Sequence, residues 1–149
     1  MMINSADITK LRNETGAGVM DCKKALEEAQ GDFNRAQKII KEKGLIKAQK
    51  REGRETKAGR IEAYVHNNRV GVLVELRSET DFVANSEPFK ELVRDMALQL
   101  VAMPAENSEE FLDQPYIKDD SKNIKDLINE LISKVGENVV LGTFYRIEL

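Results

Sequence analysis

The strongest constraint on the fold is the alternation of apolar residues at positions 60–76. Apolar side chains occupy every second position on each side of an Asn67-Asn68 pair: Ile61, Ala63, Val65, Val70, Val72, Val74 and Leu76. A period of two residues is the pattern of β-strands, and asparagine tolerates the positive φ angles of a tight turn. The sequence therefore predicts an antiparallel hairpin at this place.

Beyond the hairpin, the apolar spacing changes to that of helices. Ser86 is an N-cap residue, Pro88 suits the first turn, and one apolar stripe follows: Phe89, Leu92, Val93, Met96, Ala97, Leu100 and Val101. A second stripe covers residues 122–135, and the tail after Gly136 returns to a strand-like pattern. This combination is typical of the α+β class, so we expect a small antiparallel sheet packed with helices over residues 59–149.

The first 45 residues predict a separate three-helix domain. Short amphipathic segments cover residues 7–14, 19–30 and 33–44. Gly16 can take the left-handed conformation that closes the first helix, Asp32 is an N-cap for the third, and Gly44 marks its end. A bundle over residues 1–45 is small enough to gain stability from a partner.

A basic stretch, KAQKREGRETKAGR at positions 47–60, separates the two predicted domains. It shows no apolar periodicity and contains two glycines, so we interpret residues 46–58 as a linker that is helical at most at its start. It is the one candidate for nucleic-acid contact, but no aromatic residues alternate with its cations for base stacking. A solvated linker is favoured, and an RNA- or ribosome-associated adaptor is the alternative function.

Composition excludes several classes of protein. With 41% apolar and 33% charged residues the chain fits a globular protein, and a net charge of −3 gives no general attraction to nucleic acid or acidic membranes. No apolar run approaches the roughly 20 residues of a membrane span, and the N-terminus does not resemble a signal peptide. The single Cys22 suits a reducing compartment, so we expect a cytoplasmic protein without membrane contact.

Residues typical of catalysis or metal binding are sparse. One cysteine and one histidine, His66, exclude a Cys/His zinc site. The TGAGVMDCKK stretch has close glycines before lysines, but a predicted helix precedes it and no hydroxyl residue follows the lysines, so turn chemistry is favoured over a phosphate loop. We therefore expect no cofactor, no metal site and no catalytic residue, and we interpret the chain as a non-enzyme.

Two stretches go beyond generic fold patterns. LRNETGAGVMDCKKAL at positions 11–26 and ELRSETDFVA at positions 75–84 resemble the two signature segments of the translation elongation factor Ts family. GRIEAYVH, RVGVLVEL, QPYIKDDSK and GENVV extend the resemblance over nearly the whole chain. The resemblance implies an N-terminal domain similar to the ubiquitin-associated fold, a linker and an α+β core. It also implies a guanine-nucleotide exchange factor for the GTPase elongation factor Tu in translation elongation.

The resemblance further implies which residues meet the GTPase. The segment that reaches the partner's nucleotide site, inserts an aromatic ring and dislodges Mg²⁺ matches four residues here: Thr80, Asp81, Phe82 and Val83. The N-terminal signature implies a second set of contacts: Leu11, Arg12, Thr15, Gly16, Gly18, Met20, Asp21 and Lys23. Burial statistics alone favour Phe82 as a core residue, whereas the family match favours an exposed ring, which we predict.

The chain departs from the family pattern at several positions. Arg77 stands where members usually have Asn, and Gly142 and Thr143 stand where many have paired arginines. Long members carry a duplicated core and a helical hairpin, whereas this chain passes almost directly from Met103 to Gln114. Short members can supply the second half of the core by pairing two copies, so we expect a homodimer.

Overall fold

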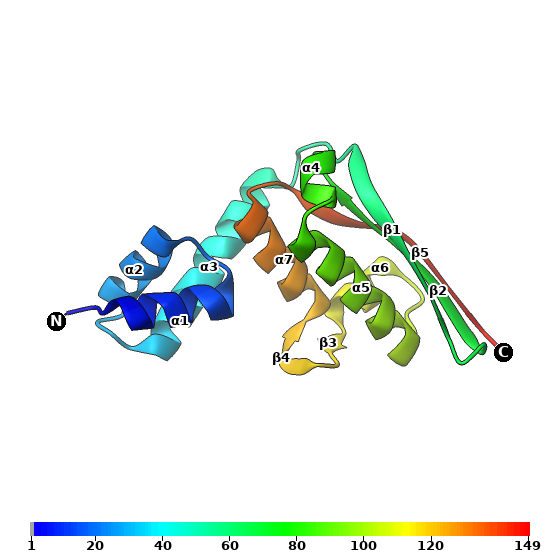
Figure 1. Cartoon of the computed structure of the whole chain (residues 1–149), viewed down its shortest axis with the longest axis horizontal. Helices are drawn as coiled ribbons and strands as arrows, with labels where there is room; N and C mark the ends of the chain where they lie inside the picture. The colour runs from blue at the N-terminus through cyan, green and yellow to red at the C-terminus, as the bar shows by residue number, and fades with distance from the viewer. Residues whose placement is uncertain (1) are drawn as a thin grey trace. The chain divides into compact units, whose positions relative to one another are not determined.

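The computed structural model describes residues 2–149, which form two compact units (Figure 1). The first unit comprises the chain up to Gly53 together with Asn129–Gly136, and the second comprises Arg54–Ile128 and Glu137–Leu149. Helix α7 (Ile124–Val135) contributes residues to both units. This division follows spatial contacts, and the domain limits predicted at residues 1–45, 46–58 and 59–149 stay a prediction.

Three consecutive helices fold together in the N-terminal unit, as the sequence predicts: α1 (Ser5–Thr15), α2 (Val19–Glu28) and α3 (Phe33–Arg51). Local chemistry sets their ends. The Asn4 side chain caps α1 by accepting the Asp7 N–H at 2.7 Å, and Gly16 closes it with a φ angle of 72°. The helices bury small and branched side chains in a shared core: Leu11, Ala17, Cys22, Ala25, Leu26, Ala29, Ala36 and Ile40.

Helix α3 runs to Arg51, whereas the sequence predicts its end at Gly44. That prediction is wrong because Gly44 stays inside the helix and does not take the left-handed conformation. A glycine inside a helix costs about 1 kcal/mol relative to alanine, and the surrounding Lys, Glu, Gln and Ala residues are good helix formers. Ala48 is buried, so the first part of the predicted linker belongs to the packed helix.

The predicted hairpin is confirmed, and it forms two strands of a three-stranded antiparallel sheet. Strand β1 (Ala58–His66) pairs with β2 (Val70–Ser78), and β2 pairs with β5 (Val139–Glu148), so β2 is the central strand. Asn67 and Asn68 have φ angles of 51° and 58°, which the tight turn between β1 and β2 requires.

Helix α5 (Glu87–Ala102) covers one face of this sheet (Figure 1). Its apolar stripe and the inward side of β2 supply buried side chains: Val72, Val74, Leu76, Phe89, Val93, Met96 and Leu100. The remaining elements are the short helices α4 (Asp81–Ala84) and α6 (Ser108–Asp113) and a small hairpin of β3 (Pro115–Tyr116) and β4 (Asp119–Asn123). The α+β class predicted from the sequence is confirmed.

Two buried glutamines close the short connection after α5. The Gln99 amide nitrogen donates to the Gln114 side-chain oxygen at 3.1 Å, and the Gln99 oxygen accepts the Ile117 N–H at 2.9 Å. Gln114 in turn donates to the Met103 carbonyl oxygen at 3.0 Å. Because both side chains are buried, these bonds take the place of water and hold the end of α5 to the β3–β4 hairpin.

We expect Gly59→Ala to destabilise the sheet. A Cβ at Gly59 would lie 2.6 Å from the Leu76 carbonyl oxygen, which belongs to the paired backbone and cannot move aside. Overpacking of this kind costs about 1–3 kcal/mol, which urea unfolding would detect. Gly71→Ala is the matched control in the same hairpin, because its nearest neighbour would be a Val65 methyl group at 3.9 Å. Equal stability of the two variants would contradict this account of the β1–β2 packing.

Candidate functional site

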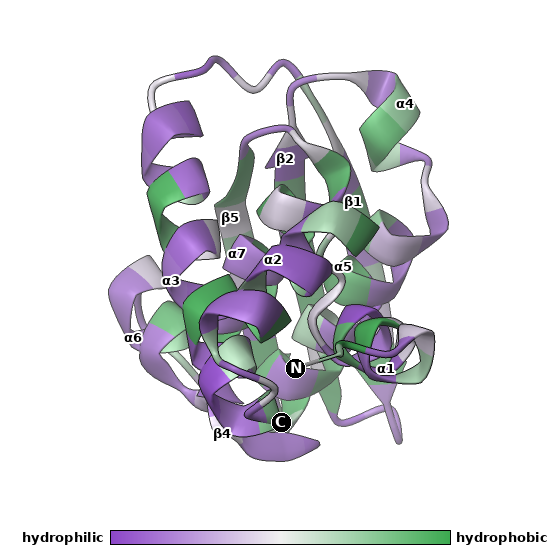
Figure 2. Ribbon diagram, turned by 90° about the vertical axis from the view of Figure 1, so that its left-hand side faces the viewer, coloured by the Kyte–Doolittle hydropathy of each residue, from purple (hydrophilic) through white to green (hydrophobic). Residues whose placement is uncertain are grey.

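Phe82 is displayed on a single helical turn. Helix α4 contains four residues, and the Thr80 side chain caps it by accepting the Val83 N–H at 3.3 Å. Val83 and Ala84 are buried, whereas the Phe82 side chain is 87% exposed. Figure 2 shows α4 as a hydrophobic turn. The predicted exposure of Phe82 is confirmed, and its interpretation as a core residue is wrong.

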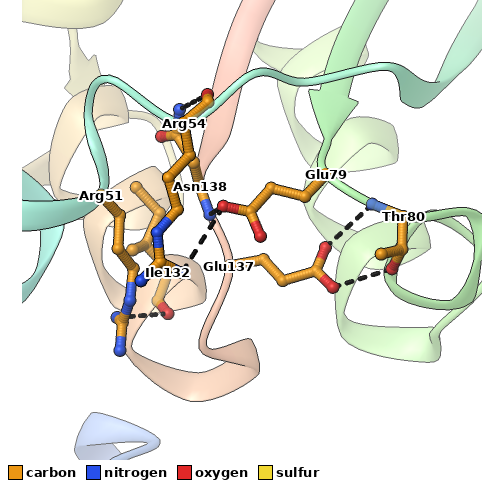
Figure 3. Close-up of polar contacts among 7 residues, drawn as sticks. All are labelled: Arg51, Arg54, Glu79, Thr80, Ile132, Glu137 and Asn138. Atoms are coloured by element: carbon orange, nitrogen blue, oxygen red, sulfur yellow. Dashed lines mark hydrogen bonds and ion pairs between the residues drawn. The ribbon is translucent and has the colours of Figure 1, made fainter.

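A carboxylate from a distant part of the sequence holds this turn (Figure 3). One oxygen of Glu137 accepts the Thr80 N–H at 3.1 Å, and the other accepts the Thr80 hydroxyl at 2.8 Å. The Ser78 hydroxyl donates to the Thr80 carbonyl oxygen at 2.9 Å. Sequence reasoning missed Glu137. The signal that could have found it is the GENVV segment, because that segment carries part of the family resemblance.

Asp81 opens α4 directly before the exposed ring. The sequence leaves open whether its carboxylate caps the turn or meets a group of a partner. In the structure the cap is the Thr80 side chain, and Asp81 lies exposed in the first turn of the helix. The turn therefore presents a carboxylate and an apolar ring side by side.

One part of the N-terminal signature builds the loop between α1 and α2. Leu11 is fully buried, and its carbonyl oxygen accepts the Thr15 hydroxyl at 2.7 Å. Gly16 ends α1 in the left-handed conformation, and Gly18 is the N-cap of α2. Because Leu11 is inside the core, any effect of Leu11 on partner binding is indirect and acts through the shape of this loop.

The other part of the signature is exposed. Met20 is 60% exposed near the start of α2, and the cationic side chains of Arg12 and Lys23 also lie on the surface. Asp21 is half-buried and pairs with Lys47 of α3 at 3.0 Å. An exposed methionine and two cations suit a partner surface that carries both apolar and acidic groups.

The departures from the family pattern lie together around Glu75. Arg77 pairs with the Glu75 carboxylate at 3.4 Å and donates to the Thr56 carbonyl oxygen at 2.7 and 3.1 Å. The same carboxylate accepts the Thr143 N–H at 3.1 Å, and a Cβ at Gly142 would collide with it. The arginine on β2 and the small residues on β5 are therefore parts of one local arrangement.

The face of the sheet opposite α5 is apolar and exposed. It carries side chains from all three strands: Ile61, Val65, Leu73, Tyr145 and Ile147. Ile147 is 72% exposed and Ile61 is 65% exposed, although alternation of this kind often marks a buried face. An apolar surface that extends over three strands is typical of an interaction site.

Most cationic side chains of the basic stretch at positions 47–60 bond to other groups of this chain. Four of its six cations bond to nearby groups: Lys47 to Asp21 at 3.0 Å, Arg51 to the Ile132 carbonyl oxygen at 3.4 Å, Arg54 to Glu79 at 3.6 Å and Lys57 to Glu55 at 3.7 Å. A nucleic acid would have to compete with these groups for the same cations. The alternative function of an RNA- or ribosome-associated adaptor stays a prediction.

Cys22 and His66 are the one cysteine and the one histidine of the chain, and Cys22 packs in the core whereas His66 lies at the end of a strand. Cys22 is buried, and burial raises the pKa of its thiol, which disfavours the reactive thiolate. The His66 ring lies 3.1 Å from the Tyr64 hydroxyl at the end of β1.

Residues 2–149 contain no group of three or more His, Cys, Asp or Glu placed to bind a metal. Over the same residues, none of the helices has the length and apolar character needed to cross a membrane.

Comparison with known proteins shows which proteins this chain is similar to. The family model described as Elongation factor TS matches residues 79–149, which include the Phe82 turn and β5. Elongation factor Ts of Coprothermobacter proteolyticus is 41% identical over 192 residues, covering 98% of this chain and 98% of the relative. Elongation factor Ts of Thermotoga maritima is 42% identical over 193 residues, covering 100% of this chain and 97% of the relative.

The similarity extends to a chloroplast protein. The chloroplastic polyprotein of EF-Ts from Oryza sativa is 41% identical over 193 residues, and the chain spans 17% of the length of that polyprotein. These relatives place the chain among translation elongation factors. It belongs to the elongation factor Ts family.

The chain is shorter than these bacterial relatives. The match to the Thermotoga maritima protein extends over 193 aligned positions, whereas this chain has 149 residues, so the relative contains residues without a counterpart here. The sequence places this difference between Met103 and Gln114, and that position stays a prediction.

We expect Phe82→Ala to leave the fold intact. Because the ring is exposed, its loss should change the free energy of unfolding by no more than about 0.5 kcal/mol. The matched control is Phe89→Ala seven residues later, where the ring is fully buried and truncation costs about 3–5 kcal/mol. Urea unfolding followed by circular dichroism measures both changes. A comparable loss of stability in the two variants would show that Phe82 is packed in the core.

Proposed function

We propose that this chain is a guanine-nucleotide exchange factor for the GTPase elongation factor Tu in translation elongation, acting in the cytoplasm. It promotes GDP release by displacing Mg²⁺ from the GTPase. The observation that carries this proposal is the exposed Phe82 ring, held on a capped turn whose next two residues are buried. Membership of the elongation factor Ts family supports the choice of partner.

The proposed activity rests on linkage between two binding events. Mg²⁺ bridges the phosphates of a bound nucleotide to its GTPase. A factor that binds the empty, magnesium-free conformation better than the occupied one lowers the affinity for GDP, and GDP lowers the affinity for the factor by the same ratio. Such a factor accelerates release without a catalytic residue of its own.

The Phe82 ring contributes only part of the required free energy. Moving a two-state equilibrium fully from one side to the other takes about 5.5 kcal/mol of differential affinity. Burying one phenylalanine side chain contributes about 1.5–3 kcal/mol. Further contacts are needed, and we assign them to the exposed N-terminal residues Arg12, Met20 and Lys23.

Thr80, Asp81, Phe82 and Val83 have different roles in this proposal. Phe82 enters the GTPase, and Asp81 reaches the nucleotide site beside it. Thr80 and Val83 keep the turn in place, through the cap and through burial in the core. Without such anchoring, inserting the ring would also require ordering of the turn, which weakens binding.

Phe82→Ala should slow the exchange reaction. Loss of the ring removes about 1.5–3 kcal/mol of differential binding, so the maximal rate of fluorescent GDP release from elongation factor Tu should fall about ten- to a hundredfold. Ile117→Ala is the control, because Ile117 is also an exposed apolar residue but lies on the β3–β4 hairpin. An unchanged rate for Phe82→Ala would overturn the role given to the ring.

Excess GDP should weaken the complex with the partner. Linkage requires that a nucleotide displaced by the factor also displaces the factor. Capture of elongation factor Tu by the immobilised chain should therefore decline when GDP and Mg²⁺ are added. Capture that does not depend on GDP would contradict exchange activity, even if the two proteins bind each other.

We also propose that the chain forms a homodimer through the exposed apolar face of the sheet. This face carries apolar side chains from β1, β2 and β5, among them Ile61, Val65, Leu73, Tyr145 and Ile147. A second copy presents the same apolar surface, and burying it removes apolar area from water on both sides. The pairing would give each core a second layer of sheet.

Ile147→Glu should shift the dimer toward monomer. Burying a carboxylate without a partner within an apolar interface is costly, so the dimer dissociation constant should rise at least about tenfold. Sedimentation velocity over a range of concentrations measures this shift. Ile117→Glu is the matched control, since Ile117 is exposed outside the three-stranded sheet. A wild-type chain that sediments as a monomer at every concentration would contradict the dimer.

A further inference from the structure

We propose that Glu137 is a positioning residue that sets the orientation of the Phe82 turn by fixing the Thr80 cap. This inference rests on the function proposed above for Phe82. Its structural part can be tested without the partner protein. Thr80 and Glu137 are 57 residues apart in the sequence, and both belong to the second unit.

The contact lies where the sheet ladder ends. The last paired residues of β2 and β5 are Ser78 and Val139. Continuing the same antiparallel register would place Glu79 opposite Asn138 and Thr80 opposite Glu137. At these positions the backbones no longer pair, so their N–H groups need other acceptors.

Two carboxylates supply those acceptors in a reciprocal manner (Figure 3). Glu79 accepts the N–H of Asn138 at 3.3 Å, and Glu137 accepts the N–H of Thr80 at 3.1 Å. Each side chain therefore serves the backbone of the residue opposite to it. The two backbone segments can separate at the end of the ladder while their amides keep charged acceptors. Such acceptors form stronger hydrogen bonds than neutral carbonyl groups.

Glu137 also determines how the Thr80 hydroxyl is used. The hydroxyl has one proton, and it donates that proton to the second carboxylate oxygen of Glu137 at 2.8 Å. Its lone pairs remain to accept the Val83 N–H at 3.3 Å, which is the cap of α4. Without the carboxylate, the hydroxyl could rotate and donate elsewhere, and the cap would lose its fixed orientation.

The cap has a large effect because α4 is a single turn. A four-residue helix is too short to be stable by itself in water, so its conformation depends on the cap and on the buried Val83 and Ala84. Phe82 lies between the cap and these buried residues. Loss of the cap would therefore release the ring from one defined position into several.

Hydrogen exchange tests the structural part on the free protein. In Glu137→Ala, the amides of Thr80 and Val83 should exchange about tenfold faster, because one loses a charged acceptor and the other loses its fixed cap. Glu137→Gln should fall between the wild type and Glu137→Ala, since its oxygen can still accept the Thr80 N–H. The matched control is Glu91→Ala, which removes an exposed carboxylate from the second turn of α5. Unchanged protection in Glu137→Ala overturns the inference.

A tryptophan in place of Phe82 gives a second, direct readout. The chain contains no tryptophan, so Phe82→Trp introduces a single fluorophore at the ring position. Fluorescence anisotropy decay should show a larger amplitude of local motion when Glu137→Ala is combined with Phe82→Trp. The same amplitude in both backgrounds would show that Glu137 does not restrain the ring.

Nucleotide release then tests the functional part. With elongation factor Tu, Glu137→Ala should lower the maximal rate of fluorescent GDP release about tenfold. The concentration for half-maximal effect should change less, because the N-terminal contacts are intact. Glu137→Gln should partly restore the rate. A rate equal to that of Glu91→Ala would overturn the positioning role even if protection of the amides is lost.

Thr80→Val provides a second test in case the Glu137→Ala variant does not fold. Valine keeps the shape of threonine but removes the hydroxyl, so it should raise exchange of the Val83 amide as Glu137→Ala does. If Glu137 acts through Thr80, the two substitutions together should slow nucleotide release by less than the product of their separate effects. Independent effects overturn the inference. If Phe82→Ala itself leaves release unchanged, the proposed function fails, whereas the protection data still decide whether Glu137 holds the turn.

Discussion

The second unit depends on the pairing and packing of its central strand, β2. It is hydrogen-bonded on both sides, and its inward residues Val72, Val74 and Leu76 are buried on the face that α5 covers. Because side chains alternate along a strand, β2 also carries Leu73 on the exposed apolar face. Its last paired residue, Ser78, stands two positions before Thr80. The central strand thus provides the core, part of the exposed apolar face and the starting point of the Phe82 turn.

The turn itself shows how a small protein exposes an apolar ring without becoming disordered. Burial of Val83 and Ala84 offsets part of the entropy of fixing the backbone, while Phe82 remains outside. The contacts of Glu137 satisfy the backbone and the hydroxyl of Thr80. In the proposed complex an ordered ring loses less freedom on entering the partner, so more of its burial is available as binding free energy. This division of roles among neighbouring residues fits a protein that acts by binding.

Much of the fold could be predicted from spacing alone. Alternation around Asn67-Asn68 predicted the hairpin, and the stripe from Phe89 to Val101 predicted α5, because both patterns depend on residues close in sequence. The exposure of Phe82 was predicted from the family resemblance. Periodicity alone predicts that a phenylalanine beside a helix belongs to the core. The end of α3 was predicted wrongly because Gly44 can stop a helix or remain inside one, and packing of Ala48 decides between these outcomes.

By itself the sequence determined the α+β class, the hairpin turn, the helix stripes and the family of this protein, because each depends on local spacing or on contiguous motifs. Tertiary structure alone decided which face of β1 lies against helices, why Arg77, Gly142 and Thr143 occur together, and which carboxylate holds Thr80. These features depend on groups far apart in the chain, such as Glu75 with Thr143 and Thr80 with Glu137. A local pattern cannot specify such pairs, since they exist only after the strands have set their register.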